Sequence, residues 1–155
     1  MTSVIMDQVS GRSLVSDALF ERLVARIVVD EQIERPMAER IMDQALAFLM
    51  ACADNPGTPL SPSRLVDVGW HTFILHTREY AAFCERVAGH FIHHVPHDDD
   101  ALSEPLGQAL GRSADAIRAA GFVVDADLWL TPDTAGALYT NCGDVGCGAG
   151  PPPHR

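Results

Sequence analysis

Apolar residues recur at helical spacing in the first third of the chain and predict two amphipathic helices. The first begins near Ser13 or Ser16, since serine caps helix N-termini, and it ends before Arg35-Pro36, because the residue preceding a proline avoids helical backbone. Pro36 suits the first turn of the second helix, which ends before the loop at 54–59. The apolar positions that define these helices are Leu14, Ala18, Leu19, Leu23, Ile27, Val28, Met37, Ile41, Ala45, Phe48 and Leu49.

Three further helices are predicted in the rest of the chain. Ser61, which is followed by a proline, is a start signal for a third helix that runs through residues 65–74. A fourth helix covers residues 77–88 and stops near Gly89, a residue type common just after a helix end. A fifth lies between about residues 103 and 120.

The predicted fold is therefore all-α, an irregular bundle of about five helices. Residues 122–130 form a short extended segment, either a strand or an arm laid on the bundle. We expect a flexible N-terminus over residues 1–12, a single helical domain over 13–140, and an irregular Gly- and Pro-rich tail over 141–155. The chain length of 155 residues suits one compact domain.

Charge and hydropathy narrow the classes of partner. The net charge is −10, and all eleven basic residues are arginine. This acidic balance argues against binding to nucleic acid or to anionic lipid surfaces. A small-molecule ligand remains open as a partner, and the sequence does not indicate a protein partner. No apolar run approaches the ~20 residues of a membrane span, and the N-terminus does not resemble a secretory signal, so a cytoplasmic location is expected.

Histidine is concentrated in one segment. Six of the seven histidines lie between His71 and His97, together with Cys84 and followed by Asp98 to Asp100. Imidazole is the commonest metal ligand, and it also titrates near neutral pH. The crowding of ligand types favours at least one metal-binding histidine pair, with solvated surface as the alternative.

Helical geometry decides which of these side chains can meet. Asp67 and His71 are four residues apart and share a helix face, either as joint metal ligands, as a ligand with its orienting carboxylate, or as a surface ion pair. Cys84 lies thirteen residues after His71, about 220° around a straight helix at ~100° per residue. Both can therefore reach one site only if the helix breaks, and the break is expected near His76.

Other chemistry has weaker support in the sequence. Cys84 with a histidine could form a reactive thiolate–imidazolium pair, but no nucleophile-elbow or phosphate-loop motif accompanies it. Cys142 and Cys147 form a C-x4-C pattern in the glycine-rich tail, where two thiols could converge on an ion, and a disordered tail is the alternative.

One motif resembles a known family. Trp70, His71, Leu75, Tyr80, Cys84, Gly89 and His94 fall on the pattern W-H-T-x-x-L-x4-Y-x3-C-x4-G-x4-H, which is similar to that of the glycine-rich domain protein-like family, found in plants and as short forms in actinomycetes. The chain departs from plant members in having Phe73 and Thr77 where those often carry histidine and proline.

The resemblance implies that four residues converge, namely His71, Tyr80, Cys84 and His94. Two imidazoles and one thiolate suit zinc, with copper as the alternative. We therefore expect a metal site formed by His71, Cys84 and His94, with Tyr80 hydrogen-bonded inside it. The residues expected to complete or support this site are Asp67, His76 and His93.

Three functions remain open at this point. The first is a small cytoplasmic metal-binding protein. The second is a metalloenzyme, hydrolytic or oxidative, in which bound water next to Tyr80 or Arg78 would carry the chemistry. The third is an adaptor without metal, in which the histidines fill a polar core and folding does not depend on an ion.

Overall fold

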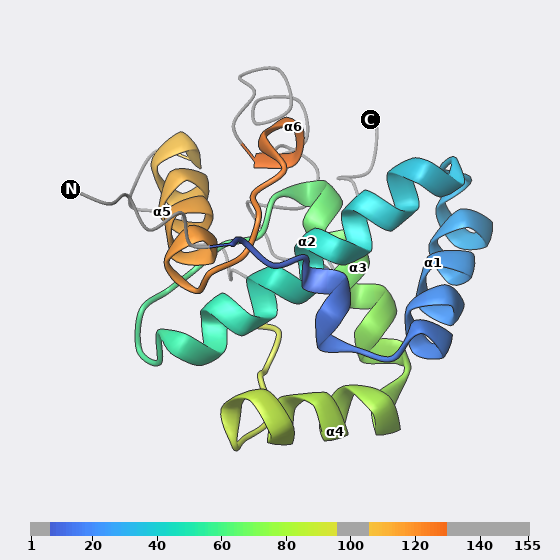
Figure 1. Ribbon diagram of the computed structural model, residues 1–155, viewed down its shortest axis with the longest axis horizontal. Coiled ribbons are helices and arrows are strands. Elements are labelled where there is room, and N and C mark those ends of the chain that lie inside the picture. Colours follow the sequence, from blue (N-terminus) through green and yellow to red (C-terminus); the bar gives the residue numbers. More distant parts are fainter. Residues whose placement is uncertain (1–6, 96–105, 130–155) are drawn as a thin grey trace, which may run out of the picture.

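The computed structural model describes residues 7–95 and 106–129, and their architecture confirms the all-α prediction. Figure 1 shows the helices gathered around α2, which crosses the middle of the molecule. In chain order the elements are the 3-10 helix η1 (Gly11–Leu14), α1 (Asp17–Glu31), α2 (Arg35–Asp54), α3 (Arg64–Leu75), α4 (Thr77–Ala88), α5 (Leu106–Ala119) and α6 (Ala126–Trp129).

The second helix is the centre of the hydrophobic core. It contacts η1, α1, α3, α4 and α5, so it is covered on nearly every side over its middle turns. A helix surrounded in this way needs apolar or small residues on all faces rather than on one stripe. Its buried residues are Ala38, Ile41, Met42, Gln44, Ala45, Leu46, Ala47, Phe48, Leu49 and Ala51.

Most predicted helix ends are confirmed, and local chemistry explains them. Ser16 caps α1 by accepting a hydrogen bond from the backbone N–H of Leu19 at 3.2 Å. Pro36 lies in the first turn of α2, and Gly89 ends α4 with a φ of 74°. The expected break falls at His76, which separates α3 from α4.

The start of the third helix was predicted two residues too early. Ser63, not Ser61, is the N-cap, and its side chain accepts from the backbone N–H of Val66. Ser61 instead pairs with Ser113 of α5, whose hydroxyl accepts from the Ser61 N–H at 3.0 Å and donates to the Ser61 carbonyl at 2.7 Å. A contact across 52 positions therefore holds Ser61 in the loop.

Residues near both edges of the described chain pair with each other. Val9 and Phe122 form an isolated parallel bridge, with hydrogen bonds from Val9 N to Gly121 O at 2.9 Å and from Val123 N to Val9 O at 3.1 Å. The expected domain boundary at residue 13 lies after this bridge and after the start of η1. The extended segment predicted for 122–130 is extended only at its beginning, since Ala126–Trp129 is a short helix.

Gln44 anchors this last segment to the core. Its side chain is buried, donates to the carbonyl of Val123 at 2.9 Å, and accepts from the backbone of Asp125 at 3.0 Å and the indole of Trp129 at 2.8 Å. Arg40, one turn earlier on α2, binds both oxygens of Asp125. A buried amide with all these partners fixes where the chain crosses α2.

Two helices approach closely at Gly69. A Cβ added there would lie 2.7 Å from the Cβ of Ala45 and 3.2 Å from the carbonyl oxygen of Ile41, both on α2. Glycine therefore lets α3 lie directly on α2, and α3 carries the residues of interest to function.

Several expectations concern residues outside the described ranges. These include the C-x4-C pair Cys142 and Cys147, the tail over 141–155, residues 1–6, and the acidic run Asp98 to Asp100 with His97. Across residues 7–95 and 106–129, no helix is both long and apolar enough to cross a membrane.

Candidate metal centre

The α3 helix positions two potential ligands on one face. Asp67 lies in its first turn, next to the N-cap Ser63, where the helix dipole favours a negative charge. His71 follows one turn later, so the two side chains stand together as their spacing predicts. Asp67 is buried, with only 5% of its side chain exposed.

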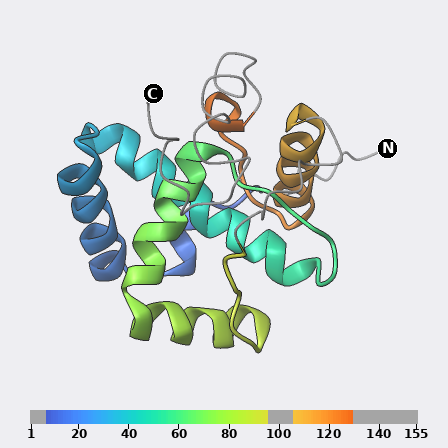
Figure 2. The same ribbon diagram turned by 180° about the vertical axis from the view of Figure 1, so that it is seen from behind.

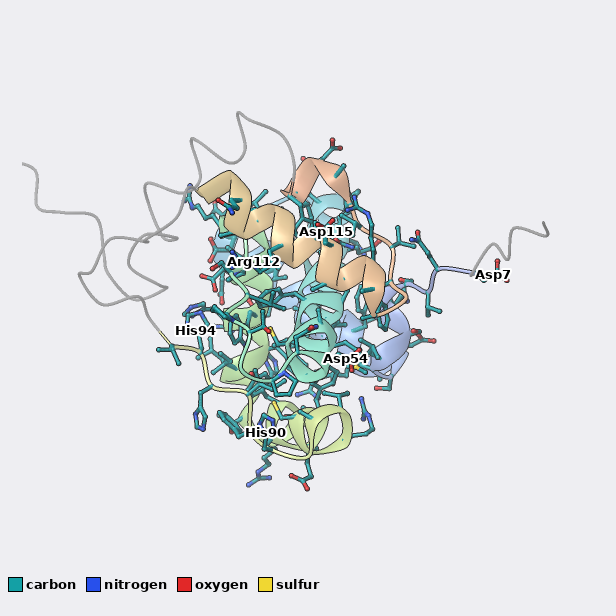
Figure 3. All side chains as sticks on the ribbon, turned by 90° about the vertical axis from the view of Figure 1, so that its left-hand side faces the viewer. Asp7, Asp54, His90, His94, Arg112 and Asp115 are labelled. Carbon is teal, nitrogen blue, oxygen red and sulfur yellow. The ribbon has the colours of Figure 1, made fainter. Side chains whose placement is uncertain are left out.

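A third ligand arrives from a segment distant in sequence. Gly89 adopts a left-handed backbone, which glycine tolerates without strain, and ends α4 so that the chain turns away from it. Figure 2 shows this chain running back from the end of α4 toward α2 and α3. We call residues 90–95 the return segment. In Figure 3, His90 is at the beginning of the return segment and lies near α4, whereas His94 lies higher, beside α3.

Asp67, His71 and His94 form a compact group. The Nε2 atom of His94 is 2.8 Å from Oδ1 of Asp67, and Nε2 of His71 is 3.7 Å from Oδ2 of the same carboxylate. All three ligand atoms lie within 4.8 Å of one another. Donors bound at ~2.0–2.2 Å to a tetrahedral ion are roughly 3.3 Å apart, so small side-chain movements would bring the group to coordinating geometry.

One nitrogen of His71 has no hydrogen-bond partner among the described residues. This Nε2 atom is buried, although 43% of the whole side chain is exposed. Burial lowers the pKa of His71, the nearby charge of Asp67 opposes this, and His94 adds to the lowering. A neutral imidazole with a free inward nitrogen is the form that binds a metal ion.

Tyr80 and Trp70 support the return segment from inside. The indole N–H of Trp70 donates to the Tyr80 hydroxyl at 2.9 Å, and that hydroxyl donates to the carbonyl of Ile92 at 2.5 Å. The ring of Trp70 also lies against that of His94, with centroids 4.3 Å apart. Burial raises the pKa of Tyr80, so the phenol stays protonated and able to donate.

Cys84 does not belong to the group. The residue is fully buried in the hydrophobic core, one helical turn after Tyr80, and its thiol contributes to the raised pKa of that phenol. Within the described ranges, Asp67, His71 and His94 are close enough to bind one ion together. Asp67 thus takes the place in this group that was expected for Cys84.

The remaining sequence candidates lie apart from the group. The Nδ1 atom of His76 is 2.9 Å from the carbonyl oxygen of Thr72, at the break between α3 and α4. His93 is exposed, with its ring against Phe91 at 4.9 Å between centroids. Arg78 is exposed on α4. The spacing of Asp67 and His71 was the available signal for the carboxylate, whereas the approach of His94 depends on how the chain turns after Gly89.

Comparison with known proteins identifies a family for this chain. A family model described as UCP032817-like matches residues 12–114, more than half of the chain, and the chain belongs to that family. The assignment to the glycine-rich domain protein-like family is therefore wrong, because the matching family is a different one. No curated protein and no solved structure matches the chain.

Proposed function

We propose that this member of the UCP032817-like family binds one divalent metal ion through Asp67, His71 and His94, with zinc as the first candidate. The observation that carries the proposal is the buried Nε2 of His71, which has no hydrogen-bond partner in residues 7–95 and 106–129 and lies 3.7 Å from the Asp67 carboxylate. Buried polar atoms in proteins nearly always have a hydrogen-bond partner. A buried nitrogen that lacks one, next to the Asp67 carboxylate and the His94 imidazole, therefore favours a bound ligand at this place. A cation bound there would satisfy it.

The donor set favours zinc over softer ions. Two imidazole nitrogens and one carboxylate oxygen are common zinc ligands, and thiolates are what select copper(I). Cys84, the one thiol expected in the site, is enclosed in the core instead. Copper(II), which also accepts imidazole and carboxylate, is the alternative that a competition experiment must address.

The number of donors supports a second candidate, a metalloenzyme. Within the described chain the group offers three donors, the number that catalytic zinc sites take from the protein while keeping a fourth position for water. Tyr80 is a poor acid–base candidate because its hydroxyl is already engaged by Trp70 and Ile92. Perturbation of the visible spectrum of the cobalt(II)-substituted protein by azide would favour this candidate.

Elemental analysis and calorimetric zinc titration of untagged protein test the proposal. We expect about one zinc per chain in the wild type and loss of binding in His71→Ala and Asp67→Asn. His90→Ala is the matched control, since His90 is an exposed histidine on the same return segment and lies outside the group. It should bind zinc like the wild type.

Two results would overturn the proposal. One is less than about 0.2 metal per chain after purification, together with no zinc binding in titration. The other is zinc binding that survives His71→Ala but is lost in His90→Ala, which would place the ion elsewhere. Titration with copper(II) against zinc decides between the two ions at the same site.

A further inference from the structure

We propose that Tyr80 is the positioning residue of this metal site: its hydroxyl holds the return segment at the place where His94 reaches Asp67 and His71. This inference rests on the proposed function for its metal-binding readout, and it has a second readout in the metal-free protein.

The return segment has few polar anchors. In the part of the chain that the structure describes, none of its residues makes a backbone–backbone hydrogen bond. Its hydrogen bonds to other described parts of the protein are the one from the Tyr80 hydroxyl to Ile92 and the one between His94 and Asp67. The Nδ1 atom of His90 lies 3.1 Å from the carbonyl oxygen of its neighbour Phe91. Within the described residues, the bond from Tyr80 is therefore the hydrogen-bond anchor of the return segment that lies outside the site itself.

The Tyr80 anchor is rigid because the phenol is fixed on several sides. Tyr80 is fully buried, and its ring meets those of Phe73 and Phe91 edge-on at 5.2 and 5.1 Å between centroids. Its oxygen accepts from the Trp70 indole, which leaves the hydroxyl proton to point at Ile92. A donor held in this way needs no reorganisation to fix the carbonyl two residues before His94.

Trp70 connects the anchor to the ligand directly. The same indole that donates to Tyr80 lies against the ring of His94 at 4.3 Å, so it restricts the tilt of the imidazole. Hydrogen bonding fixes the backbone of the return segment, and ring packing fixes the side chain. Trp70 and Tyr80 thus support the site from behind, and neither belongs to the group of potential ligands.

The substitution Tyr80→Phe removes the hydroxyl and keeps the ring. We expect zinc affinity to fall about tenfold while the stoichiometry at saturation stays at one, the size of effect seen when groups that orient metal ligands are removed. In the metal-free protein, the imidazole nitrogen resonances of His94 should move toward those of a free histidine. That NMR readout reports on the bond to Asp67 without any metal.

Ile117→Val is the matched control. Ile117 is fully buried on α5 and lies outside the Trp70–Tyr80–Ile92 chain, and losing one methylene there lowers stability modestly. It should leave both zinc affinity and the His94 resonances unchanged. The inference is overturned if Tyr80→Phe binds zinc like the wild type with unshifted His94 resonances, or if Ile117→Val weakens binding equally. Failure of the wild type to bind zinc would overturn the proposed function, whereas the metal-free His94 resonances would still decide the role of Tyr80.

Discussion

Asp67 and His94 lie 27 positions apart in the chain, and a 2.8 Å hydrogen bond joins their side chains. Both are largely buried, with 5% and 11% of their side chains exposed. The bond joins the first turn of α3 to the return segment. It therefore closes a ring of chain that contains the rest of α3, all of α4 and the turn at Gly89. A bond that closes such a loop should matter to the fold even when no metal is bound.

Removing the charge of Asp67 should therefore destabilise the metal-free protein. We expect Asp67→Asn to lower the free energy of unfolding by about 1–3 kcal/mol, since the hydrogen bond loses its charged acceptor and the helix N-terminus loses a favourable anion. Urea unfolding in the presence of a chelator measures this. Asp115→Asn is the control, because Asp115 is 81% exposed and its ion pair with Arg118 should contribute less than about 1 kcal/mol. Equal losses in both variants would contradict the expectation.

Stability of the metal-free protein should rise with pH through the His71 titration. Burial keeps the pKa of His71 in the folded protein below that in the unfolded chain, which is about 6.5. The unfolded chain therefore binds more protons between the two values, and the contribution is lost as pH falls below about 6.5. Urea unfolding at several pH values between 5 and 7.5 tests this. His71→Gln should flatten the slope, and an unchanged slope would show that other groups cause it.

The close approach of α3 to α2 makes Gly69 sensitive to a single methyl group. Gly69→Ala should destabilise the protein by about 1–3 kcal/mol, because its Cβ would fall 2.7 Å from that of Ala45. Gly111→Ala in the middle of α5 is the opposite case. A Cβ there meets nothing within 4 Å, so the better helix former should stabilise by about 0.5–1 kcal/mol. Thermal denaturation of both variants checks the sign of each effect, and a neutral Gly69→Ala would mean that the helices can separate without cost.

Gln44 should be costly to replace by an apolar residue of similar size. Gln44→Leu removes the hydrogen-bond partner of the Trp129 indole N–H, the Val123 carbonyl and the Asp125 N–H. We expect the free energy of unfolding, measured with denaturant, to fall by about 2–4 kcal/mol. The control Gln108→Leu changes an exposed position on α5 and should stay within about 0.5 kcal/mol of the wild type. Comparable losses in the two variants would show that the amide network contributes little.

The helices could be predicted where local chemistry sets their ends. Ser16, Pro36 and Gly89 each act on the backbone within a few residues, so the sequence alone indicates where α1, α2 and α4 begin or end. The start of α3 was placed at Ser61 because a proline follows that serine, whereas the cap is Ser63. The bonds that hold Ser61 to Ser113 of α5 depend on the assembled fold.

At the candidate site, too, contacts within one helix could be predicted, whereas contacts made by the assembled fold could not. The pairing of Asp67 with His71 follows from helical spacing, whereas the structure brings His94 to these two residues and not to Cys84. The burial of Cys84 could not be read from the sequence, because a cysteine on a helix is equally suited to a core and to a metal. Which of the clustered histidines turns inward depends on the Tyr80 anchor, a contact between α4 and the segment after it.

The parallel bridge between Val9 and Phe122 bears on how much chain the protein needs in order to fold. A fragment cut to the family-matched residues 12–114 would lose both halves of the bridge and the buried side chains of Phe122, Leu128 and Trp129. Gln44 and the ring of Phe48, which lies 5.9 Å from that of Trp129, would then face solvent on the central helix. A fragment that keeps these contacts must include Val9 and Trp129, so it is longer than the range that the family model matches.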